Sequence, residues 1–334
     1  MKRLVRIGLI IILTFNICFV QAQKKTLVAS ASMMADMAEN IAGDLVDVKY
    51  IVPRGQDPHL YKPTPSDVVM VEKADLIIIN GLTFEGWISK LIDNSGTKAE
   101  TVTVTEGIKA ISSAKYQNSF DPHAWMDVSL VQIYIDNIRD ALISLLPEER
   151  DAFEENHAHY SNELRELDEY IMEKVKEIPA GKRVLITSHD AFAYYGRRYG
   201  LQLEAIVGIS TEAEVQSSDI IRVHKIIKES EVPAIFMEST INPKILRQIA
   251  KDNRIVVGGE LFADSLGEKG SPADTYLKML RYNTETIVRG LTTSEEAESE
   301  KLVDTGTSGF LPYLLLGLGM IVIVFFVVRK LNKS

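Results

Sequence analysis

Residues 147–178 have the sequence pattern of a single long amphipathic helix. Pro147 suits the first position of a helix, and Pro179 with Gly181 would end it. At about 1.5 Å per residue the helix would span roughly 45–50 Å, far more than the usual helix of a globular domain. A coiled coil is one alternative, but the pattern covers few heptads, so we expect a rigid rod between two lobes. Its apolar stripe has steps of three, four or seven and consists of Phe153, Tyr160, Leu164, Leu167, Ile171, Val175 and Ile178.

Both flanks of this helix alternate short β-rich apolar runs with amphipathic runs. Before it, strands are expected at residues 26–30, 47–52, 75–80 and 100–105, and helices at 33–42, 66–73, 84–92 and 128–146. After it, strands are expected at 183–187, 203–207, 234–237 and 255–257, and helices at 191–199, 219–229, 243–251 and 273–289. Such alternation favours parallel sheets with helices on both faces. The expected fold is therefore α/β, with two doubly wound lobes, residues 23–146 and 179–291, joined by the rigid helix 147–178.

The two ends of the chain carry apolar runs of different kinds. Three basic residues precede the run 7–20 and small residues follow it, so residues 1–22 are expected to be a signal peptide, with a retained anchor as the alternative. Residues 292–309 are polar and acidic and predict a flexible tether. Residues 310–328 are uncharged and are followed by basic residues, which predicts one transmembrane helix with a cytoplasmic tail, 329–334. Both lobes would then be periplasmic or otherwise extracytoplasmic, anchored to the membrane by this C-terminal helix.

Composition narrows the classes of function. The net charge is −9 and no basic cluster lies outside the ends, which argues against a nucleic-acid partner. The single cysteine, Cys18, lies in the expected signal peptide, so an exported body would form no disulfide and would bind metal through nitrogen and oxygen. The sequence has no His-Glu-x-x-His motif, no phosphate-binding glycine loop and no Gly-x-Ser-x-Gly elbow. We therefore predict no catalytic residues and no enzymatic activity.

Groups suited to metal binding follow four of the expected strands. In open α/β sheets, ligand groups collect beyond the carboxyl ends of the strands. The tripeptide Asp-Pro-His occurs after two strands of the first lobe and supplies His59 and His123. Its proline biases the preceding aspartate toward an extended geometry, which helps to hold the imidazole in one direction. His189 and Asp264 follow the first and last strands of the second lobe. The sequence thus predicts one divalent metal site in the cleft between the lobes, with these four residues as ligands.

Other titratable groups have weaker claims on such a site. Glu238, at the end of an expected strand, is the best candidate for an alternative or outer-sphere carboxylate. His157 and His159 lie two positions apart on the long helix, so they face different directions and are expected to be solvated. His224 has no partner at ligand spacing. Asp190 and Asp127 are candidates to orient ligands, and helix capping is an equally good prediction for Asp190.

Five segments of the sequence resemble one protein family. DPHLYKPTPSD, DPHAWMDV, ITSHDAFAYYGRRYGL, GISTEAEVQSSDI and GELFADSLG are similar to segments of the metal-specific solute-binding proteins of ABC importers, the zinc, manganese and iron group. The resemblance covers residues 26–291. It implies two α/β lobes on one rigid helix, with a divalent cation held between them. It further implies delivery of that cation to a membrane permease driven by a cytoplasmic ATPase. The family's ligand positions fall on His59, His123, His189 and Asp264.

The identity of the metal stays open between Zn²⁺ and Mn²⁺, with Fe²⁺ a weaker candidate. Many zinc-specific relatives carry a histidine-rich loop where residues 112–119 contain no histidine, which disfavours zinc. His189, however, stands where manganese-type relatives often have glutamate. Two other functions also remain open. One is a surface-displayed adhesin or scaffold with a structural metal, and the other is a metallohydrolase, which would need an exchangeable water on the metal.

Overall fold

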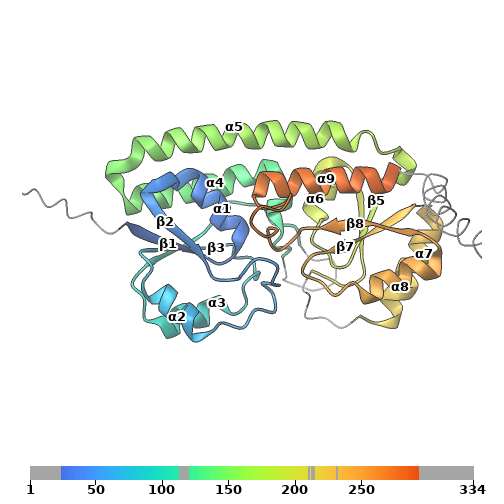
Figure 1. The fold of residues 1–334 in the computed structure, drawn as a ribbon, viewed down its shortest axis with the longest axis horizontal. Helices are drawn as coiled ribbons and strands as arrows, with labels where there is room; N and C mark the ends of the chain where they lie inside the picture. The colour runs from blue at the N-terminus through green and yellow to red at the C-terminus, as the bar shows by residue number, and fades with distance from the viewer. Residues whose placement is uncertain (1–23, 113–119, 210, 212–214, 231, 293–334) are drawn as a thin grey trace, which may run out of the picture.

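The computed structural model of this chain describes residues 24–112, 120–209, 211, 215–230 and 232–292 (Figure 1). The expected signal peptide, the transmembrane segment, the cytoplasmic tail and the tether beyond Thr292 lie outside these described residues. Within the described residues, no helix is both long enough and apolar enough to cross a bilayer.

The first lobe is built on a four-stranded parallel sheet with the order β2-β1-β3-β4. Its strands are β1 (Lys25–Ala29), β2 (Val46–Tyr50), β3 (Leu76–Ile79) and β4 (Glu100–Thr103). Helices α1 (Ser32–Ala42) and α4 (Val128–Leu145) cover one face, and α2 (Pro65–Glu72) and α3 (Ile88–Ser95) cover the other (Figure 1). Because both faces are covered, the apolar side chains of the two central strands are almost all buried.

The second lobe repeats this plan with two parallel pairs of strands. β5 (Val184–Thr187) pairs with β6 (Gln202–Ala205), and β7 (Ala234–Glu238) pairs with β8 (Val256–Leu261). β5 lies beside β7. Helices α6 (Ala193–Tyr199) and α9 (Tyr276–Thr292) lie on the side of the long helix, with α7 (Ser217–Ser230) and α8 (Lys244–Asn253) on the far side (Figure 1). The expected α/β class with parallel sheets and a long helix is confirmed.

The long helix spans both lobes. A 3₁₀ turn, Pro147–Glu149, leads into α5 (Arg150–Val175), which runs along the top of the molecule over the first and second lobes (Figure 1). All seven residues of the predicted stripe are at most 2% exposed, and α5 packs on α1 and α4 of the first lobe and on α6 and α9 of the second. Since the stripe is covered by the chain's own lobes, α5 is a bridging rod and the coiled-coil alternative is wrong.

The loop before α3 departs from the predicted helix at 84–92, because α3 begins only at Ile88. Just before the predicted helix, Gly81, Leu82 and Thr83 have φ of 80°, 53° and 68°, so the chain makes a left-handed turn there. The buried Glu85 stabilises this turn by accepting the backbone N–H groups of Asn80 (2.7 Å) and Gly81 (3.1 Å).

Strand β8 is longer than the predicted run 255–257, because it continues through two glycines to Leu261. A Cβ atom at Gly258 would lie 2.7 Å from the ring of Phe236 on the neighbouring strand, so the absence of a side chain lets the two strands pair. The extension matters for the site, since it delivers the chain to the loop that carries Asp264.

Candidate metal site

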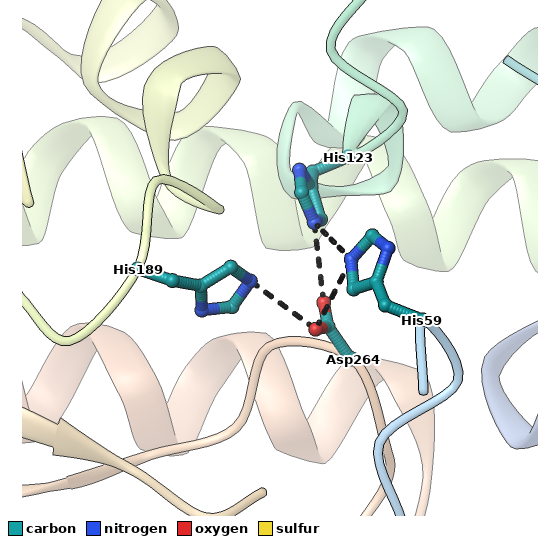
Figure 2. A group of neighbouring side chains, drawn as sticks. All are labelled: His59, His123, His189 and Asp264. Carbon is teal, nitrogen blue, oxygen red and sulfur yellow. Dashed lines mark hydrogen bonds and ion pairs between the residues drawn. The ribbon is translucent and has the colours of Figure 1, made fainter. Parts of the chain in front are cut away.

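The four side chains predicted to bind metal meet between the lobes (Figure 2). His59 and His123 come from the loops after β2 and β4, His189 follows β5, and Asp264 follows β8. One ligand atom from each lies within 4.8 Å of the other three. The side chains of His123, His189 and Asp264 are fully buried, and that of His59 is 5% exposed. Residues more than 200 positions apart in the sequence therefore converge on one point, as the strand-end pattern predicted.

The spacing of the ligand atoms suits one small cation. Nε2 of His59 is 3.3 Å from Nε2 of His123, and Nε2 of His123 is 3.4 Å from Oδ1 of Asp264. Oδ2 of Asp264 lies 3.2 Å from Nε2 of His189 and 3.6 Å from Nε2 of His59. Nitrogen and oxygen ligands at about 2.0–2.2 Å from a tetrahedral Zn²⁺ lie about 3.3–3.6 Å from one another. The cluster thus has nearly the dimensions of a single coordination sphere.

Both Asp-Pro-His tripeptides orient their histidines through the aspartate. Oδ1 of Asp121 accepts the backbone N–H of His123 (2.9 Å) and lies 2.7 Å from its Nδ1. Oδ1 of Asp57 likewise accepts the backbone N–H of His59 (2.8 Å), and its Oδ2 accepts the hydroxyl of Thr211 from the second lobe (2.6 Å). Because Nδ1 of His123 is engaged by Asp121, its Nε2 is the atom that faces the cluster.

Glu238 holds His189 in the same way from the end of β7. Its Oε1 accepts the backbone N–H of His189 at 2.8 Å, and its Oε2 lies 2.5 Å from Nδ1 of the imidazole. The carboxylate is 1% exposed. Of the two roles that the sequence left open for Glu238, the structure places it behind the histidine, as an outer-sphere carboxylate, and not among the four converging ligand atoms.

Three buried carboxylates around two buried imidazoles give the site a strong attraction for cations. Burial alone would lower the pKa of His123, but Asp121 and Asp264 raise it to about 9. Burial also opposes a charge on His189, yet Glu238 and Asp264 raise its pKa well above the usual value. Burial would raise the pKa of Asp264, but the two imidazolium groups hold it well below its ordinary range. The negative charge of the site is therefore balanced by protons, which a divalent cation can replace.

An aromatic wall covers the side of the cluster toward the first lobe. The ring of Phe84 lies 5.0 Å from the ring of His59 and 4.8 Å from that of Trp125, which in turn lies 5.2 Å from His123. Burial lowers the pKa of His59 to about 3, so its imidazole is neutral and can act as a ligand. Neither aromatic residue was predicted from the sequence, although Trp125 lies only two positions after His123 of the second Asp-Pro-His tripeptide.

Several atoms of the cluster form the ion pairs described above but make no hydrogen bond of normal geometry among the described residues. They are both carboxylate oxygens of Asp264 and Nε2 of His189. Buried polar atoms are rarely left without a partner, because each unmade hydrogen bond costs free energy. A divalent cation such as Zn²⁺, Mn²⁺ or Fe²⁺ would satisfy all three atoms, so the residues present fit a metal ion.

The other histidines of the described chain lie outside this cluster. His159 is exposed as predicted, but the prediction that His157 is also solvated is wrong, because its side chain is 15% exposed and its Nε2 lies 2.9 Å from Asp136. Nδ1 of His224 lies 2.6 Å from the amide nitrogen of Asn253. Asp127 accepts the N–H of Ser129 and caps α4, a role that the sequence suggested for Asp190 and not for Asp127.

Comparison with known proteins points to one family. Residues 27–290 match the family model described as the periplasmic zinc-uptake complex component A. The manganese-binding lipoprotein MntA of Halalkalibacterium halodurans is 37% identical over 265 residues, which cover 79% of this chain and 88% of that protein. The manganese ABC transporter substrate-binding lipoprotein PsaA of Streptococcus anginosus is 36% identical over 278 residues, covering 80% and 90%.

Solved structures with the same fold are also those of metal-binding proteins. The periplasmic zinc-binding protein TroA of Treponema pallidum superposes with a TM-score of 0.78 at 34% identity, covering 81% of this chain and 100% of that one. A manganese-bound periplasmic metal-binding protein of Candidatus Liberibacter asiaticus superposes with a TM-score of 0.74 at 32% identity, covering 80% and 100%.

Proposed function

This chain belongs to the family of the periplasmic zinc-uptake complex component A, and from that premise we propose that it is the extracytoplasmic substrate-binding component of an ABC importer for a divalent transition metal. The observation that carries the proposal is the convergence of His59, His123, His189 and Asp264 in a buried site between the lobes. We propose these four as the ligands of the transported ion. Its partners would be a membrane permease and the ATPase that drives it.

We propose Mn²⁺ or Zn²⁺ as the cargo. Three imidazoles suit Zn²⁺, whereas carboxylate oxygens suit Mn²⁺, which prefers more than four ligands. Both oxygens of Asp264 face imidazoles, Oδ1 toward His123 and Oδ2 toward His59 and His189, so this carboxylate can offer two ligand atoms to one ion. The relatives described above are named for manganese and the solved structures for both metals. A site filled by protein ligands leaves no position for an activated water, which supports a binding protein over a metallohydrolase.

Calorimetric titration of the metal-free, full-length protein with Mn²⁺ or Zn²⁺ tests this function. We expect one ion per chain, and we expect His59→Ala and His123→Ala each to weaken binding by at least about 10–100-fold, since even outer-sphere changes cost that much. His159→Ala, in an exposed histidine of α5, is the matched control and should bind like the wild type.

Two results would speak against the proposed function. Unchanged binding in both ligand variants would show that the ion is held elsewhere. Unfolding of the protein on chelation would favour the adhesin or scaffold with a structural metal, because a transport receptor must stay folded when it is empty.

We further propose how this chain is organised and anchored. Its relatives are named lipoproteins, whereas the only cysteine here is Cys18, within the apolar N-terminal run. We propose that residues 1–22 direct export, that 23–146 and 179–291 form the lobes and that 292–309 tether them to a transmembrane helix at 310–328. Residues 329–334 would remain in the cytoplasm.

Deletion of residues 310–334 is expected to move the protein from the membrane fraction to the soluble exported fraction, because the uncharged segment supplies the membrane affinity. Immunodetection after cell fractionation measures this. Cys18→Ala in the full-length chain is the control and should leave the protein in the membrane fraction. A truncated protein that still sediments with membranes would mean that the anchor lies elsewhere.

A further inference from the structure

The segment that carries Asp264 lies between β8 and α9, in the sequence of the second lobe, but its hydrogen bonds lead to the first lobe. The indole N–H of Trp125 donates to the carbonyl of Ala263 at 3.0 Å. The backbone N–H of Leu266 donates to the hydroxyl of Ser32 at 3.0 Å, and the N–H of Gly55 donates to the hydroxyl of Ser265 at 2.7 Å. Contacts with the first lobe therefore fix the chain on both sides of the metal ligand.

Arg54 of the first lobe forms hydrogen bonds with the same segment further along the chain. Its Nη1 donates to the carbonyl of Gly267 at 2.6 Å and to the carbonyl of Asp274 at 2.7 Å. These two carbonyls lie at the start and the end of a turn, residues 267–274. Its two ends are also joined by a hydrogen bond from the N–H of Gly267 to the carbonyl of Ala273, at 2.9 Å. One guanidinium group thus fixes both ends of the turn that follows Asp264.

The segment ends in α9, and here too the partners are in the first lobe. Oδ2 of Asp36 accepts the N–H of Tyr276, the first residue of α9, at 2.9 Å. The hydroxyl of Tyr276 donates to the carbonyl of Trp125 at 2.5 Å. Seven hydrogen bonds in all connect residues 263–276 with residues of the first lobe.

His189, the other ligand from the second half of the chain, is held differently. Glu238 accepts its backbone N–H and contacts its Nδ1, and the hydroxyl of Thr187 donates to its carbonyl at 2.7 Å. All of these contacts lie within the second lobe. Among the described residues, fewer polar contacts join the rest of that lobe to the first. The hydroxyl of Tyr194 accepts the N–H of Ile111 and donates to the carbonyl of Asp121, and the hydroxyl of Thr211 donates to Asp57. Arg198 also forms an ion pair with Asp127 at 3.8 Å.

We propose that Arg54, with Ser32 and Trp125, positions Asp264 from the first lobe, so that three of the four metal ligands form a half-site on one body and His189 alone completes it from the other. This inference rests on the proposed function. Arg54 binds the backbone carbonyls of residues 267 and 274 and is not one of the four proposed ligands, so it is a positioning residue.

Substitution of Arg54 in the full-length protein tests the proposal. Arg54→Met removes both carbonyl contacts, and we expect Mn²⁺ and Zn²⁺ to bind about 10–100-fold more weakly, as for other residues that orient metal ligands. The loss should come mainly from faster release, which is measured by mixing the loaded protein with a chelator. Arg54→Lys keeps a cation that can donate to both carbonyls, so it should bind within about threefold of the wild type.

Arg183→Met is the matched control. Arg183 also donates to two backbone carbonyls, those of Ile178 (2.9 Å) and Lys176 (3.3 Å), but at the end of the long helix. Its loss should leave metal affinity unchanged. Urea unfolding of each metal-free variant shows whether it folds. If Arg54→Met does not fold, Ser32→Ala takes its place, because it removes a different contact with the same segment.

A double-mutant cycle separates positioning from a general structural role. If Arg54 acts through Asp264, Arg54→Met should have little further effect on affinity in an Asp264→Ala background but its full effect in a His189→Ala background. Equal losses of metal affinity in both backgrounds, or an Arg54→Met protein that binds like the wild type, would overturn this inference. Neither result would contradict the proposed function as a metal receptor. A wild-type protein that binds neither ion would overturn both.

Discussion

Replacing Asp264 with alanine is expected to weaken the binding of Mn²⁺ and Zn²⁺ more than any other single change in this protein. Asp264 is the only anionic member of the proposed ligand set, it is fully buried, and its two oxygens lie 3.2–3.6 Å from the three imidazoles. Removing one partner of a buried ion pair costs about 3–5 kcal/mol. At about 1.4 kcal/mol for each tenfold change, the dissociation constant should rise by a factor of roughly 10²–10⁴.

Competition with a chelator of known affinity measures this loss. Asp264→Asn keeps an oxygen at the same place but removes the charge. We therefore expect it to bind metal at most about tenfold more tightly than Asp264→Ala. Asp252→Asn, in an exposed residue of α8, is the control for a change of net charge away from the site. An Asp264→Ala protein that binds within about threefold of the wild type would remove this residue from the ligand set.

The place of the site could be predicted because two simple regularities determine it. A period of 3.6 residues identified the long helix, and its stripe is buried because both lobes need that apolar surface covered. Parallel strands bring their carboxyl ends to one edge, so residues that follow different strands, such as His59, His123 and His189, were expected to meet. Neither regularity depends on contacts between particular distant side chains. The long helix and the meeting point of the strand-end residues could therefore be predicted from the sequence.

What the sequence did not reveal depends on just such contacts. Arg54 and the carbonyl it binds at Gly267 are 213 positions apart, and nothing local to either residue indicates the pairing. The late start of α3 follows from a buried carboxylate, Glu85, that binds backbone groups outside the helix. The extension of β8 through Gly258 depends on the ring of Phe236 on another strand. In each case tertiary packing overrides local propensity.

Asp36→Asn is expected to stabilise the metal-free protein at neutral and alkaline pH. Asp36 is 4% exposed on α1, and burial raises its pKa from 3.8 to about 6 although it accepts the N–H of Tyr276. Arg54 opposes this rise, whereas Glu39 and Asp274 add to it. Between pH 3.8 and about 6, Asp36 holds a proton in the folded protein but has lost it in the unfolded chain. The contribution of Asp36 to the free energy of unfolding therefore falls as the pH rises through 6, and it is unfavourable above that pH.

At about 1.4 kcal/mol per pKa unit, the charged carboxylate costs up to about 3 kcal/mol above pH 6. The amide oxygen of asparagine can still accept the N–H of Tyr276, but its –NH₂ needs a partner, so a gain of about 1–3 kcal/mol is expected near pH 8 and almost none near pH 4. Urea unfolding at several pH values, with metal removed, measures the difference in the free energy of unfolding between Asp36→Asn and the wild type. Groups that titrate alike in the two proteins do not contribute to this difference. Asp93→Asn, in an exposed residue of α3, should change stability by less than about 0.5 kcal/mol throughout. A difference between Asp36→Asn and wild type that does not vary with pH would show that charge burial at this residue carries no free-energy cost.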